Sequence, residues 1–125
     1  MEKIKFLDKA HEKAFEKVCN QMHNLDCYHR AVAYLLSLDV VLRNHIQEVF
    51  DFEEDCIKCD SLQKDWQTGT SLKVVRLAYN LWNGCYYDNY IDDGSCGYYS
   101  VGEIFSAGGQ YAEYYWVAIK LRFGY

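Results

Sequence analysis

The segment from residue 31 to residue 42 constrains the fold more than any other part of the chain. Its apolar side chains fall on nearly every side of a helix, and they are Ala31, Val32, Tyr34, Leu35, Leu36, Leu38, Val40, Val41 and Leu42. A helix that is apolar all round lies at the centre of a domain. Ser37 and Asp39 are expected to kink or split this helix, and Asp39 and Arg43 have the spacing of a surface pair. The run is too short and too polar to span a membrane.

Three further segments show helical periodicity. They run from about residue 9 to 22, from about 71 to 83 and from about 110 to 122. Asp8 is a good N-cap for the helix at residues 9–22. Thr70 or Ser71 is expected to cap the helix at residues 71–83, and Gly84 is expected to end it. The sequence from Ser100 to Glu103 is typical of a capping box before a short helix.

These segments predict an all-α fold. The 125 residues contain no proline and are long enough to bury one core. We therefore expect one compact domain, residues 1–125, built as a bundle of about four main helices plus short ones. The side chains expected in its core are Leu35, Leu38, Val41, Tyr115, Trp116 and Ile119.

The charge distribution bears on the kind of partner. The net charge is −5, and residues 51–125 hold eleven acidic side chains against six basic ones. An acidic chain without a basic cluster is a poor candidate for binding a phosphate backbone, so no nucleic acid is expected.

The six cysteines indicate a compartment rather than a disulfide framework. The N-terminus lacks the apolar region of an export signal, so we expect reduced thiols in the cytoplasm and no cofactor. Cys56 and Cys59 have the spacing of half a zinc site, which is a weak metal candidate because no matching second pair follows. We expect no bound metal.

Several stretches resemble a known family. They are Phe6-Leu7 with His11 and Phe15; Tyr34 to Asp39 with Arg43, His45 and Phe50-Asp51; Trp66 to Ser71 followed by Arg76 to Gly84; and Tyr115 to Arg122. Together they resemble a family of small proteins of unknown function from Gram-positive bacteria and their phages. The resemblance implies a gene of phage or mobile-element origin that acts in the host cytoplasm, and it implies no shared activity.

The helix predicted at about residues 71–83 carries a candidate anion site. Its start offers free amide hydrogens at Thr70 and Ser71, and a polar stripe follows at Lys73, Arg76, Asn80 and Asn83. A phosphate or nucleotide is one possible occupant, with Arg76 binding it through two hydrogen bonds. The glycine and lysine spacing is not that of a P-loop. The alternative is an ordinary capped helix with a polar face.

The segment 85–99 is rich in tyrosine and aspartate. The candidate partner-binding residues in it are Tyr86, Tyr87, Asp88, Tyr90, Asp92 and Asp93. Tyrosine gives a large contact area at low entropic cost, so such a segment suits protein recognition. The alternative is that these tyrosines pack back on the core.

No complete catalytic constellation can be placed from the sequence. The four histidines are scattered, Arg43 and His45 are expected to point to different sides, and His11 on an apolar face is expected to be a packing histidine with its polar atoms satisfied. We therefore expect a non-catalytic binding protein. The resemblance to phage proteins implies that it binds a host protein and inhibits an antiviral defence. A binder that sequesters a phosphate-containing signalling molecule is the second possibility, and a small enzyme with an unrecognised site is the third.

Overall fold

A computed structural model describes residues 3–84, 87–88, 97–98, 101–105 and 111–124 of the chain. These residues are mostly helical. The elements, in chain order, are α1 (Lys9–Gln21), α2 (Cys27–Leu36), α3 (Val40–Arg43), α4 (Ile46–Val49), β1 (Phe50–Asp51), β2 (Cys56–Ile57), the 3-10 helix η1 (Cys59–Gln63), α5 (Gly69–Asn83), β3 (Tyr87–Asp88), β4 (Gly97–Tyr98), α6 (Val101–Phe105) and α7 (Ala112–Phe123). No helix among the described residues is long and apolar enough to cross a membrane.

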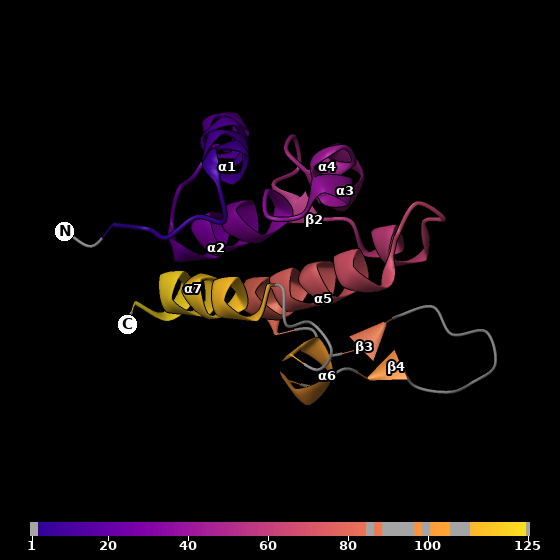
Figure 1. Ribbon diagram of the computed structural model, residues 1–125. Coiled ribbons are helices and arrows are strands. Elements are labelled where there is room, and N and C mark those ends of the chain that lie inside the picture. Colours follow the sequence, from indigo (N-terminus) through magenta and orange to yellow (C-terminus); the bar gives the residue numbers. More distant parts are fainter. Residues whose placement is uncertain (1–2, 85–86, 89–96, 99–100, 106–110, 125) are drawn as a thin grey trace.

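Helix α2 lies at the centre of the molecule. It packs against α1 on one side and against α5 and α7 on the other (Figure 1). Its buried residues are His29, Ala31, Val32, Ala33, Tyr34, Leu35 and Leu36. The prediction of a central helix is therefore confirmed, because a segment that is apolar on every side loses most contact with water only when helices surround it.

The predicted central helix is split at Ser37 and Asp39, as expected. Ser37 ends α2 and donates its hydroxyl hydrogen bond to the carbonyl of Ala33 at 2.7 Å. Asp39 begins α3, and its carboxylate accepts the backbone N–H groups of Val41 and Leu42 at 3.1 and 3.2 Å. The predicted surface pair between Asp39 and Arg43 is wrong. Asp39 is buried as a helix cap, and Arg43 donates to the carbonyls of Ser37 and Leu38.

Side-chain caps fix where α1, α2 and α5 begin. Asp8 accepts the N–H of His11 at 2.8 Å, and Asp26 accepts the N–H of His29 at 3.0 Å. Helix α5 begins two residues earlier than predicted. Its N-cap is Thr68, which forms a capping box with Ser71, so neither Thr70 nor Ser71 is the cap.

Two short antiparallel hairpins join the helices. Phe50 pairs with Ile57 in the first hairpin, and Tyr87 pairs with Tyr98 in the second. The first hairpin and the 3-10 helix η1 both lie within residues 50–63. The pairs are too short to form a sheet layer, so the core remains one between helices.

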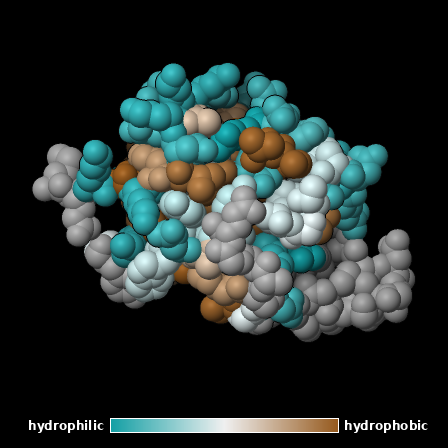
Figure 2. Space-filling model, in the orientation of Figure 1, coloured by the Kyte–Doolittle hydropathy of each residue, from teal (hydrophilic) through white to brown (hydrophobic). Residues whose placement is uncertain are grey.

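The predicted core is correct for three of its six members. Leu35, Leu38 and Tyr115 are fully buried, whereas Val41 and Ile119 are half-buried. Trp116 is 50% exposed, so its predicted burial is wrong. Helix α7 turns Tyr115 and Ala118 toward α2, and this places Trp116 on the outer side. In Figure 2, apolar side chains reach the surface in separate patches, and hydrophilic side chains line the upper edge of the molecule.

Candidate functional site

Three large aromatic side chains are exposed on α2 and α7. Tyr28 is 39% exposed, Trp116 is 50% exposed and Phe123 is 55% exposed. Trp116 and Phe123 stand seven residues apart on α7, which places them on the same side of the helix, with Lys120 between them. Large apolar side chains clustered on one face are more informative than scattered ones, because such patches mark contact sites.

Arg122 connects Phe123 to Tyr28. Its guanidinium carbon lies 3.8 Å from the centre of the Tyr28 ring and 4.6 Å from that of Phe123, and its Nε donates to the carbonyl of Leu81 at 2.8 Å. Stacking against two rings and a backbone hydrogen bond hold the guanidinium in one place. We call Tyr28, Trp116, Lys120, Arg122 and Phe123 the aromatic surface.

A cleft of about 580 Å³ lies where four helices begin. Its lining includes Asp8, Asp39, Thr68 and Tyr111, which are the N-caps of α1, α3, α5 and α7. Asp39 also accepts a hydrogen bond from the Tyr111 hydroxyl at 3.2 Å. Burial and the negative charge of Asp39 raise the pKa of Tyr111. The protein thus places its own carboxylates at two of these helix ends, which suits the positive ends of the helix dipoles.

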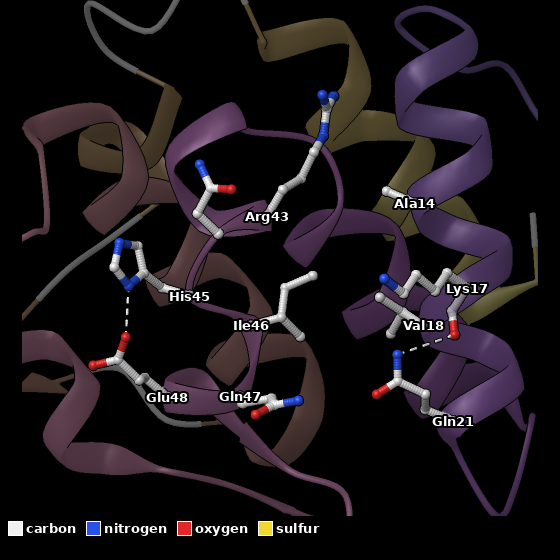
Figure 3. A pocket seen from close by; sticks show the side chains of 10 residues that line it. Ala14, Lys17, Val18, Gln21, Arg43, His45, Ile46, Gln47 and Glu48 are labelled. Carbon is white, nitrogen blue, oxygen red and sulfur yellow. Dashed lines mark hydrogen bonds and ion pairs between the residues drawn. The ribbon is translucent and has the colours of Figure 1, made fainter.

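Arg43 lies between this cleft and a second one. Its Nη2 is 3.9 Å from Asp8 Oδ1 on the side of the first cleft. The second is a groove of about 450 Å³ between α1 and the α3–α4 segment (Figure 3). In that view Arg43 and His45 point away from each other, as the sequence predicts.

One carboxylate orients His45 at the edge of the groove. Glu48 accepts hydrogen bonds from His45 Nδ1 at 2.5 Å and from Trp66 Nε1 at 3.1 Å, and the imidazole stacks on the Trp66 indole at 4.2 Å. The hydrogen bond from His45 lowers the pKa of Glu48. An oriented imidazole is half of an acid–base pair, but the lining contains no hydroxyl or thiol that it could activate.

Comparison with known proteins places the chain in a family. One family model, described as a family of unknown function, matches residues 1–125. The chain belongs to this family, DUF6075. No curated protein and no solved structure matches the chain.

The structure separates the candidate anion site of this DUF6075 protein into three environments. Thr70 is exposed and lines the cleft, whereas Ser71 is fully buried and donates its hydroxyl hydrogen bond to Gln67 within the cap. The polar stripe lies further along α5 and lines neither the cleft nor the groove, and its members are Lys73, Arg76, Asn80 and Asn83. The structure therefore brings only Thr70 of this set beside Arg43 and Tyr111.

Most of the candidate partner-binding loop lies outside the described residues. This applies to Tyr86, Tyr90, Asp92 and Asp93. The backbone of Tyr87 and Asp88 forms β3, paired with β4.

The two candidate metal ligands, Cys56 and Cys59, lie on two different elements. Cys56 is exposed on β2, and Cys59 is half-buried at the start of η1. Among the residues that the structure describes, no group of three His, Cys, Asp or Glu side chains is placed to hold a metal ion.

His11 is a satisfied packing histidine, as predicted. It is fully buried, its Nδ1 accepts the N–H of Leu7 at 3.1 Å, and its Nε2 lies 2.9 Å from the carbonyl of Tyr34. Burial lowers its pKa, so the neutral ring donates from Nε2.

The aromatic surface was missed by sequence reasoning. Helix α7 is apolar on several sides, so periodicity does not distinguish the side that faces α2 from the outer side. The spacing of Trp116, Lys120 and Phe123, four and three residues apart, was the available signal of a shared face.

Proposed function

We propose that this protein acts by stoichiometric binding of a partner protein through the aromatic surface. The observation that carries the proposal is the exposure of Trp116 and Phe123 beside an arginine held between two rings. Binding energy at protein interfaces concentrates in tryptophan, tyrosine and arginine side chains. Arg122 is already positioned, so binding would cost little of its side-chain entropy.

The charge of the surface indicates the chemistry of the partner. The last turn of α7 carries Lys120 and Arg122, whereas the chain as a whole has a net charge of −5. A partner that fits has apolar pockets for the rings and an acidic rim for the two cations. The complex is then weakened by salt.

The wider function is also a proposal. The partner is a host protein of an antiviral defence, the protein is its non-catalytic inhibitor of phage or mobile-element origin, and the setting is the host cytoplasm. The scaffold is one domain of residues 1–125, a bundle whose main helices are α1, α2, α5 and α7. The segment from Tyr86 to Asp93 extends the contact. The support is the family resemblance and the exposure of the aromatic surface.

A phosphate-containing ligand is the second candidate function. The supporting observation is the cleft beside Thr70, where Arg43 lies near the start of α7, whose N-cap Tyr111 makes no side-chain capping bond. Asp8 and Asp39 oppose it, because two carboxylates in the same cleft repel a phosphate. The protein-binding proposal therefore ranks first.

Paired substitutions test the main proposal. Partner protein is captured from host lysate, purified, and titrated calorimetrically with each variant. Trp116→Ala and Phe123→Ala should each weaken binding by about 2 kcal/mol, roughly thirty-fold, as hot-spot truncations do. Val40→Ala is the matched control, because Val40 is 62% exposed on α3.

Three outcomes contradict the proposal. Undiminished binding by the Trp116→Ala, Phe123→Ala double variant excludes the aromatic surface. Stabilisation of the chain by inorganic phosphate or a nucleotide, lost in Arg43→Ala or Arg76→Ala, favours the second function. Turnover of more than one substrate per chain excludes both binding functions.

A further inference from the structure

His29 is a buried imidazole held between two carboxylates. Its side chain is 5% exposed, its Nδ1 lies 2.7 Å from Asp26 Oδ1, and its Nε2 lies 2.8 Å from Asp55 Oδ1. Asp26 is the N-cap of α2, and Asp55 lies in the turn between β1 and β2. One ring thus joins the start of the central helix to the hairpin.

Both contacts are satisfied only by the charged ring. An ionised carboxylate can only accept a hydrogen bond, and a neutral imidazole carries only one N–H. The two short contacts therefore require two N–H donors, which the imidazolium has. With both carboxylates ionised, this geometry therefore fits a doubly protonated ring.

The other contacts of the His29 ring that involve described residues are aromatic. The edge of the Trp82 ring from α5 packs 4.8 Å from the imidazole, and Phe50 from β1 packs at 6.3 Å, measured between ring centres. The charged groups that act on His29 are Asp26 and Asp55. Burial is the largest single effect and lowers the pKa, but the two carboxylates together outweigh it, so the pKa of His29 is raised above 6.5.

Besides His29, Asp51 supports the turn between β1 and β2, because its Oδ1 accepts the N–H groups of Glu53 and Glu54 at 3.0 and 2.9 Å. Asp55 has a φ of 58°, a left-handed conformation that costs a residue other than glycine roughly 1 kcal/mol or more. The hairpin has two residue pairs, and an isolated hairpin is marginal in water. The contact with His29 adds the connection between Asp55 in this turn and the start of α2.

We propose that His29 is a pH-sensitive clasp, which as an imidazolium holds the β1–β2 hairpin against α2 and on losing its proton releases the turn at Asp55. A group whose folded pKa is raised contributes stability at low pH. That contribution is complete below the unfolded-state pKa and disappears as pH rises through the folded pKa. The position of the acidic turn, with exposed Glu53 and Glu54, follows the protonation of one residue.

Nitrogen-detected NMR of the full-length chain with labelled histidine tests the clasp directly. Both His29 nitrogens should stay protonated to higher pH in the folded chain than in the same chain unfolded in urea. Amide exchange of Glu53, Glu54 and Lys58, relative to the intrinsic exchange rate at each pH, should accelerate over the pH range in which His29 loses its proton. If His29 loses its proton at the same or a lower pH in the folded chain, or if this relative exchange does not change as His29 titrates, the clasp is excluded.

Asp55→Asn separates charge from shape. Asparagine keeps the size, accepts a hydrogen bond and tolerates the left-handed conformation, but it lacks the charge. His29 should lose its proton at lower pH in this variant, and the hairpin should open at correspondingly lower pH. Glu54→Gln, a charge removal on the same turn without contact to His29, should leave both transitions in place. Equal shifts in the two variants would show a general charge effect and overturn the proposal.

Discussion

Tyr115 carries a phenol hydroxyl that is buried on α7 without a hydrogen-bond partner among the described residues. Burial raises the pKa of this phenol to about 12. Tyr34 is equally buried, but its hydroxyl donates to the carbonyl of Lys5 at 2.5 Å. Two tyrosines of the same core thus differ in whether the cost of burying a hydroxyl is offset.

Removing each hydroxyl should change stability in opposite directions. Tyr115→Phe deletes an unsatisfied polar atom and should raise the free energy of unfolding by about 1 kcal/mol. Tyr34→Phe leaves the Lys5 carbonyl without its donor and should lower it by about 1 kcal/mol. Urea denaturation of both variants measures the difference, and the same sign for both would contradict this account.

At the scale of elements, the start of α5 depends on a local hydrogen-bond exchange. Thr68 Oγ1 accepts the N–H of Ser71 at 2.9 Å, and Ser71 Oγ accepts the N–H of Thr68 at 2.7 Å. Thr70, two residues after the cap, is exposed and takes no part. The sequence Thr-Gly-Thr-Ser offers three hydroxyl side chains for one cap, so propensity could not choose between them.

The two threonines provide a matched test of the cap. Thr68→Ala should lower the free energy of unfolding by about 0.5–2 kcal/mol, the usual effect of losing an N-cap. Thr70→Ala should change it by less than about 0.5 kcal/mol, as surface substitutions do. Thermal unfolding of the two variants measures both changes. Equal losses of stability would show that Thr68 is not the cap.

For the whole molecule, stability depends on the packing of α1, α5 and α7 around α2. Leu35 lies in the middle of α2 and is fully buried, whereas Val40, just after the split, is 62% exposed. Leu35→Ala should lower the free energy of unfolding by about 2–5 kcal/mol, because it removes contacts and leaves a cavity. Val40→Ala should change it by less than about 0.5 kcal/mol. Equal effects in chemical denaturation would show that α2 is not the central element.

The sequence by itself determined the helical class, the central segment and its interruption at Ser37 and Asp39. Helical period and capping are local properties, since they depend on residues within one or two turns. The packing role of His11 also followed from its place on an apolar face. These predictions needed no knowledge of which helices are neighbours.

Only the tertiary structure decided which side of α7 faces the core, which exposes Trp116, and which distant groups meet. Asp55 reaches His29 across 26 residues, and Tyr111 reaches Asp39 across 72. Periodicity gives each helix its faces but not its neighbours, and long-range pairs leave no mark in local spacing. The aromatic surface, the cleft between helix ends and the His29 clasp therefore all arose from packing.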